Sequence, residues 1–350
     1  MPKLCPIVVL TALNVILAAS PVTILSAQEM PRLAQSPSSD QGKDQDQGLD
    51  TLKVNVNVVQ LFFNVKDKKG GLIANQTKDD FEIFEDGKPQ TIKYFTAESN
   101  LPLTLGILID SSPSQQRVLE MEKEVGAAFL SQILRDKDEA FVIGFDENID
   151  LLQDFTNSTR RLKDALNSVR IGGGEPDPRG IPGMGGGPVP TMARACCTML
   201  YDAVYLASHD ELSQEVGRKA MILLTDGEDE GSKLRIKDAI EAAQKSDAIV
   251  YVLLCADRGF YGMGGYSGEG EMKKLTEETG GRVIEVGNKP EKLRDAFDQI
   301  SKELRSQYNI GYTPTNAALD GTYRKIDLHS KGGYKIQARS GYYATAHSKE

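Results

Sequence analysis

Two runs of almost uninterrupted apolar residues, each ending in aspartate, constrain the fold more than any other feature of the chain. They read LTLGILID (residues 103–110) and AMILLTD (residues 220–226). A strand with one face in water alternates apolar and polar residues, so runs without alternation indicate strands buried on both faces. Such strands are typical of a parallel sheet that helices cover on both sides.

The segments between and around these runs have the apolar spacing of helices. Pro290, at the start of the last helical segment, suits the first turn of a helix. Further strands are predicted at 139–146, 248–255 and 282–286, and helices at 116–134, 158–169, 200–212, 233–246, 269–280 and 290–306. The alternation predicts an α/β domain over residues 100–306 with a doubly wound, mostly parallel sheet.

The segments on either side of this domain have β character. Residues 51–97 show β-branched alternation and an Asp86-Gly87 pair between two alternating runs, which is a strong hairpin signal. Alternation returns in residues 307–344. We expect the two segments to pair as one smaller, discontinuous all-β domain into which the α/β domain is inserted.

The N-terminal residues 1–27 have the pattern of a secretory signal peptide: one lysine, an apolar run and then small residues, with cleavage predicted after Ala27. The alternative is an uncleaved membrane anchor, although Asn14 and Pro21 interrupt a run that is short for a span. Residues 28–50, rich in Gln, Ser, Asp and Pro, predict a disordered linker. The chain is therefore expected to be exported, to the periplasm or the extracellular space, with no membrane span after cleavage.

The net charge and the cysteine content limit the partners and the disulfides that the chain can have. The formal net charge of −9 argues against a nucleic-acid partner, because such proteins carry a basic footprint. Cleavage would leave Cys196, Cys197 and Cys255, which permit one internal disulfide and leave one thiol over. The sequence leaves open whether that disulfide forms.

Oxygen-bearing side chains gather where the two apolar runs end. Asp110, Ser112 and Ser114 follow the first run, and Asp226 ends the second. The carboxyl ends of parallel strands share one edge of the sheet, where ligands bind. Thr198, just before a predicted helix, either caps that helix or faces the same edge. Hard oxygen ligands favour Mg²⁺, with Mn²⁺ as the alternative.

Asp-Ser-Ser after a strand is also ordinary turn and helix-cap chemistry. The second aspartate, on the corresponding strand end, favours the metal interpretation over the structural one. The histidines His209, His329 and His347 show no ligand spacing, so a zinc site is not expected.

Three segments in order resemble the metal-ion-dependent adhesion site (MIDAS) of von Willebrand factor A (VWA) domains, a Rossmann-like fold. They are Asp-Ser-Ser-Pro-Ser (110–114), CTMLYDAV (197–204) and LLTDGEDEG (223–231). The flanking β segments resemble the VWFA-related acidobacterial-type family of exported proteins. The resemblance implies metal ligands at Asp110, Ser112, Ser114, Thr198 and Asp226. It also implies a protein partner that presents an Asp or Glu to the metal.

The function predicted is an exported, metal-dependent adhesion or interaction module, without catalytic residues. One alternative is a metal-independent structural protein of the cell envelope with a degenerate site. The other is a Mg²⁺-dependent phosphoryl-transfer enzyme, which the sequence favours less: Ser112 stands where an Asp-x-Asp nucleophile motif needs its second aspartate, and neither a Gly-x-Ser-x-Gly nor a P-loop motif is present.

Overall fold

The apolar runs form the middle of a six-stranded sheet. Its strands are β5 (Leu103–Asp110), β6 (Glu139–Phe145), β7 (Ile149–Thr156), β8 (Arg218–Thr225), β9 (Ala248–Leu254) and β10 (Val283–Glu285), in the order β10-β9-β8-β5-β6-β7. All neighbours are parallel except β7, which pairs antiparallel with β6 at one edge. The computed structural model describes residues 58–98, 101–172, 197–255 and 268–345.

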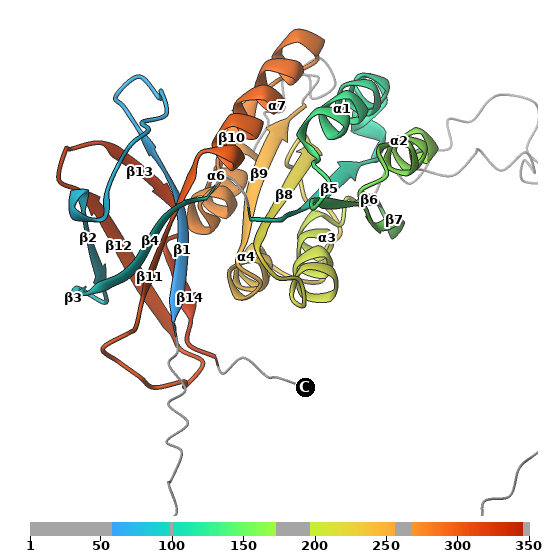
Figure 1. The fold of residues 1–350 in the computed structure, drawn as a ribbon. Helices are drawn as coiled ribbons and strands as arrows, with labels where there is room; N and C mark the ends of the chain where they lie inside the picture. The colour runs from blue at the N-terminus through green and yellow to red at the C-terminus, as the bar shows by residue number, and fades with distance from the viewer. Residues whose placement is uncertain (1–57, 99–100, 173–196, 256–267, 346–350) are drawn as a thin grey trace, which may run out of the picture. The chain divides into compact units, whose positions relative to one another are not determined.

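Helices cover both faces of this sheet, as Figure 1 shows. On one face, α1 (Leu119–Ile133), α2 (Thr159–Ser168) and α7 (Pro290–Arg305) share a hydrophobic cluster with the strands. On the other face, α3 (Leu200–Leu206), α4 (Ile236–Lys245) and α6 (Gly268–Thr279) do the same, and a π-helical segment at Ala207–Leu212 continues α3. The predicted α/β fold with a mostly parallel sheet is confirmed. The edge strand β7 was not predicted.

The flanking segments build two four-stranded sheets. The first contains β1 (Val59–Lys66), β4 (Ile92–Glu98), β11 (Gln307–Tyr312) and β13 (Lys335–Ala338); the second contains β2 (Phe81–Glu85), β3 (Lys88–Gln90), β12 (Tyr323–Ser330) and β14 (Gly341–Tyr343). Strands from before the α/β segment pair antiparallel with strands from after it, as expected. Side chains from both sheets share a third hydrophobic cluster.

The hairpin predicted at Asp86-Gly87 forms, but its second arm is short. Both turn residues have positive φ, 47° for Asp86 and 76° for Gly87, as a tight turn of this type requires. The arm that pairs with β2 ends at Gln90. The strand that resumes at Ile92 is β4, which pairs with β11 in the other sheet. The prediction of one alternating run after the turn missed this exchange of sheets.

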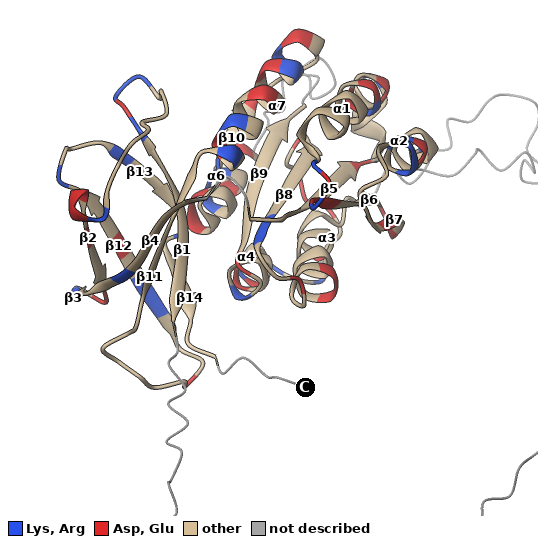
Figure 2. Ribbon diagram, viewed as in Figure 1, with Lys and Arg blue, Asp and Glu red and all other residues tan. Residues whose placement is uncertain are grey.

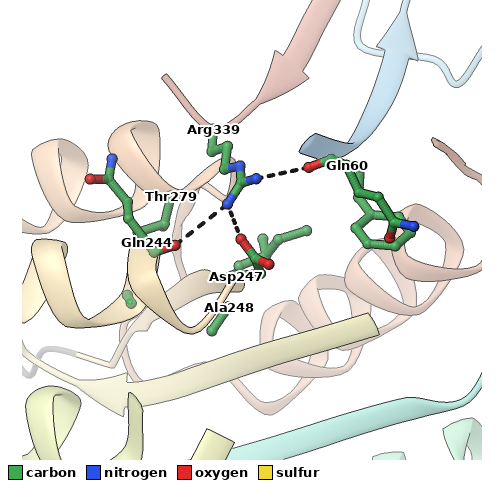
Figure 3. A pocket seen from close by; sticks show the side chains of 9 residues that line it. Gln60, Gln244, Asp247, Ala248, Thr279 and Arg339 are labelled. Carbon is green, nitrogen blue, oxygen red and sulfur yellow. Dashed lines mark hydrogen bonds and ion pairs between the residues drawn. The ribbon is translucent and has the colours of Figure 1, made fainter. Parts of the chain in front are cut away.

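The outer face of β1 contacts the α/β segment. Gln60 and Phe62 line a small cavity together with residues of α4 and the turn after it. Arg339, just after β13, points into this cavity, as Figure 3 shows, and pairs with Asp247. Its guanidinium also donates to the backbone carbonyls of Gln60, at 2.8 Å, and Gln244, at 3.4 Å. The described residues belong to one compact unit, residues 55–350, and the division into an inserted α/β domain and a β domain stays a prediction.

Several predictions concern residues outside the described ranges. These are the signal peptide at 1–27 and the linker at 28–50. Within the described ranges, no helix combines the length and the apolar character that crossing a bilayer demands.

Candidate metal centre

The candidate site lies where the two central strands of the six-stranded sheet end. The chain order along the sheet reverses between β5 and β8, which are adjacent and parallel. Asp110 is the last residue of β5, and Asp226 directly follows β8. Open α/β sheets bind ligands at such a switch point, outside the carboxyl ends of the strands. Both carboxylates are buried, at 0% and 2% exposure.

Hydrogen bonds join four of the five predicted residues into one group. The Ser114 hydroxyl donates to Asp226 Oδ2 at 2.5 Å, and the Ser112 and Ser114 hydroxyl oxygens lie 3.0 Å apart. The backbone N–H of Ser112 donates to Asp110 Oδ1 at 2.9 Å. A 3-10 turn at Pro113–Gln115 follows Ser112, so the fixed φ of Pro113 suits the turn that joins the two serines.

Thr225 belongs to the same group and was missed in the sequence. Its hydroxyl donates to Asp110 Oδ2 at 2.6 Å and accepts the N–H of Gly227 at 3.0 Å. This side chain ties the end of β8 to the end of β5. The other Asp226 oxygen, Oδ1, accepts the N–H of Glu228 at 3.1 Å. In the sequence, the only sign of this role is that Thr225 directly precedes Asp226 in MILLTD. That position points to Asp110 only once β8 is known to lie beside β5.

Thr198, the fifth predicted residue, lies against the loop that follows Asp226. Its carbonyl accepts the N–H of Glu230 at 3.1 Å, and the residue is 6% exposed. Cys197 before it has a φ of 103°, which side-chain-bearing residues rarely adopt. Gly231 packs so closely that a Cβ there would come within 2.7 Å of the Cys197 Cβ. The missing side chain at Gly231 therefore allows the loop after Asp226 to pack against Cys197, next to Thr198.

Burial and the charge of Asp226 disfavour ionisation of Asp110. Burial, and then the charge of Asp226, raise the pKa of Asp110 to about 7, against the hydrogen bonds from Ser112 and Thr225. A nearby cation stabilises the charged form of a carboxyl, and it does so most usefully where a second carboxyl opposes ionisation. The electrostatics of the site therefore favour a bound cation.

Glu122 is a second functional candidate that the sequence analysis did not single out. It lies on α1, is 0% exposed, and neither carboxyl oxygen has a hydrogen-bond partner among the described residues. Burial raises its pKa to about 8; the nearby Cys255 thiol opposes this rise, and the charges of Asp110 and Asp226 add to it. These influences indicate that Glu122 is near the site. The available signal was its place in the apolar stripe of the helix, between Leu119 and Val125.

Cys197 and Cys255 are not bonded to each other in the structure. Cys255 is buried, and burial raises the pKa of its thiol well above the ordinary value, with the Glu122 charge adding to it. A neutral, buried thiol packs as a small apolar side chain. Cys196 lies outside the described residues.

The donor set suits a hard divalent cation. Asp110 and Asp226 supply carboxylate oxygens, and Ser112 and Ser114 supply hydroxyl oxygens, all within one hydrogen-bonded group. Oxygen donors of this kind suit Mg²⁺ or Mn²⁺. Over the described ranges, no group of three or more His, Cys, Asp or Glu side chains is arranged to hold a metal. A cation here would therefore depend on the serine hydroxyls as well as on the two aspartates.

Comparisons with known proteins found similar solved structures, but neither a matching protein family nor a matching curated protein. No protein-family model matches the chain, and no curated protein matches it. Among solved structures, the protein BatB from Bacteroides thetaiotaomicron matches with 21% identity and a TM-score of 0.42, covering 58% of this chain and 100% of its own. A von Willebrand factor type A protein from Catenulispora acidiphila matches with 14% identity and a TM-score of 0.45, covering 76% and 73%.

A third structure is proximal thread matrix protein 1 from the mussel byssus, solved with a zinc-occupied MIDAS motif. It matches with 14% identity and a TM-score of 0.43, covering 68% of this chain and 50% of its own. Likeness at this level concerns the fold and carries no argument about ligands, so the roles of the five site residues stay a prediction. In its fold, this chain is similar to von Willebrand factor type A domains.

Proposed function

We propose that the chain is an exported protein-binding module that captures an acidic side chain of its partner at a divalent cation, Mg²⁺ in the first place. The residues proposed to hold the cation are Asp110, Ser112, Ser114, Thr198 and Asp226. The proposal of export rests on residues 1–27 of the sequence.

One observation carries the proposal: two buried carboxyls lie at adjacent strand ends and are linked through two serine hydroxyls. The pKa of Asp110 is raised by burial and by Asp226, so ionising Asp110 beside the second carboxylate is costly in the metal-free chain. Buried charges are kept in proteins when a partner or a metal compensates them. A divalent cation would offset both charges at once.

Each residue would have its own part in holding the cation. Asp110 and Asp226 would supply the negative charge, directly or through water, while the hydroxyls of Ser112 and Ser114 would supply neutral oxygens. Thr225 would hold the Asp110 carboxylate in place through its 2.6 Å hydrogen bond. Since only two of the ligands are charged, a bound Mg²⁺ would remain electrophilic enough to accept a carboxylate from a partner.

The metal is tested first, by calorimetric titration of Mg²⁺, Mn²⁺ and Zn²⁺ into the full chain. We expect saturable Mg²⁺ or Mn²⁺ binding that Asp110→Asn abolishes, because the amide keeps the shape and removes the charge. Asp298→Asn, at an exposed position of α7, is the matched control and should bind as the native chain does. Native-like metal binding by Asp110→Asn would contradict the proposed site.

The partner class is tested by selecting random displayed peptides on the immobilised chain, with Mg²⁺ or with a chelator. Peptides selected with Mg²⁺ should be enriched in Asp and Glu, and they should not bind the Asp110→Asn variant. Acidic peptides that bind equally in chelator would contradict a metal-mediated capture. Metal binding without any acidic enrichment would retain the metal site and reject this partner.

A further inference from the structure

A groove rich in cationic side chains lies where the end of β1, the loop after it and the last turns of α7 meet. It has about 510 Å³ of space, and its lining includes Lys66, Lys69, Arg282 and Lys302 against one carboxylate, Glu303. Four positive charges against one negative charge give a formal net charge of +3, in a chain whose total is −9. Figure 2 shows Lys and Arg on this loop and on α7.

The single carboxylate of the groove is already engaged. Glu303 Oε1 accepts from Lys66 Nζ at 2.8 Å and from Arg282 Nε at 2.8 Å. Its Oε2 accepts from the Gln337 amide at 3.2 Å. Two of the four cations are therefore paired with Glu303, and the exposed Lys69 and Lys302 share the groove without a second carboxylate among its lining residues.

The strand pairing adds a further positive charge beside the groove. Lys66 lies directly opposite Lys335 in the antiparallel pair of β1 and β13. Like charges at directly opposite positions destabilise a sheet. Burial lowers the pKa of Lys66, Glu303 opposes this, and the charges of Arg282 and Lys335 lower it further. The cations therefore repel one another in the absence of an added anion.

One neighbouring carboxylate, Asp67 in the loop after β1, is offset by the neighbouring Lys335, so the formal excess around the groove stays +3. It is not among the groove's lining residues, and its Oδ1 accepts the backbone N–H groups of Lys69 and Gly71. The junction in Figure 3 differs, because there the chain's own Asp247 meets the one guanidinium, Arg339. At that junction the chain supplies the anion itself, whereas the Lys66 groove keeps an excess of cations.

We propose that this groove binds a doubly charged tetrahedral oxyanion: free phosphate or sulfate, or the phosphate monoester group of a small ligand. Lysine ammonium groups bind such oxyanions as point charges through charge-assisted hydrogen bonds. A doubly charged group would offset Lys69 and Lys302 together, whereas a monocarboxylate would offset one. The groove shares none of the proposed metal ligands, so the inference is independent of the proposed function.

The test is calorimetric titration of the full chain with sodium phosphate, sodium sulfate and sodium acetate, at constant ionic strength and with a chelator present. We expect saturable binding of phosphate or sulfate in the millimolar range and binding of acetate at least about tenfold weaker. The variant Lys69→Ala/Lys302→Ala should bind the oxyanion at least about tenfold more weakly. Comparing phosphate with sulfate shows which of the two oxyanions the groove prefers.

Lys163→Ala/Lys292→Ala is the matched control, since it removes two exposed lysines from the outer faces of α2 and α7. It changes the net charge equally and should leave oxyanion binding within about twofold of the native value. The proposal is overturned if neither oxyanion binds saturably up to about 50 mM. It is equally overturned if acetate binds as tightly, or if the control loses as much affinity as the groove variant.

Discussion

Two buried glutamates on neighbouring helices show how differently this molecule treats a carboxyl group. Glu122 on α1 is 0% exposed and Glu303 on α7 is 3% exposed, and the two helices pack together with the Phe129 and Phe297 rings 4.3 Å apart. Yet the pKa of Glu122 is raised to about 8, while that of Glu303 is lowered. Burial raises both pKa values, so burial does not decide the direction.

The groups that contact each carboxyl decide the direction of its pKa shift. Lys66 and Arg282 donate to Glu303 and outweigh its loss of hydration. No cationic side chain donates to Glu122 within the described part of the chain, and the carboxyls of Asp110 and Asp226 add their negative charge. Glu303 is therefore compensated within the chain, whereas Glu122 and Asp110 stay protonated more readily and would gain from an added cation. This difference separates a structural ion pair from a candidate binding site.

The largest expected effect comes from removing the charge of the compensated group. Glu303→Gln leaves Lys66 and Arg282 beside a neutral amide, and breaking a buried ion pair in this way costs about 3 kcal/mol or more. Urea unfolding should show this loss of stability at pH 7. Glu291→Gln, at an exposed position of the same helix, is the control and should change little. A loss below about 1 kcal/mol for Glu303→Gln would show that the pairs are worth no more than exposed ones.

A smaller effect is expected from pH at the uncompensated group. The folded-state pKa values of Asp110 and Glu122 are raised to about 7 and about 8, so their contribution to stability is fully present below the unfolded values near 4 and is lost as pH rises through 7 to 8. The metal-free chain should be less stable at pH 8.5 than at pH 7.0, by about 2 kcal/mol in urea unfolding.

Glu122→Gln isolates one part of this pH dependence, because glutamine keeps the shape and does not titrate. The variant should lose less stability than the native chain between pH 7.0 and pH 8.5. Saturating Mg²⁺ should also reduce the loss, since a cation favours ionised carboxyls. Glu303 has no part in this window, because a lowered pKa makes its contribution fall only as pH drops below about 4.5. An identical pH dependence in Glu122→Gln would remove this residue from the comparison.

The smallest effect is expected from removing an exposed ion pair. Arg294 on α7 lies 3.6 Å from Glu124 on α1, with 57% and 79% of the two side chains exposed. Water screens such a pair, so Arg294→Ala should cost between about 0 and 0.5 kcal/mol in the same unfolding measurement. A cost that approaches that of Glu303→Gln would mean that burial matters less than the comparison of the two glutamates implies.

The sequence predicted most of the fold because its signals are local. The apolar runs at 103–110 and 220–226 and the helical spacing between them identified the covered parallel sheet. The start of α7 at Pro290 was also predicted correctly. The edge strand β7 was missed, and so was the exchange of β4 into the other sheet, because an edge position and a choice of partner leave only weak traces in a single segment.

The sequence by itself identified the candidate site residues: the aspartates that end two strands, the serines after Asp110, and Thr198 between them and Asp226 in the chain. Only the tertiary structure decided which of these groups meet. The order of the six strands placed β8 beside β5, which brought Thr225 onto Asp110 and Ser114 onto Asp226. The packing around α1 and α7 decided that, of the two buried glutamates, Glu303 is the one with two cations against it. The reason is physical: strand ends and helix caps follow from neighbouring residues, whereas the field at a buried carboxyl is set by groups far away in the sequence, as Lys66 is from Glu303.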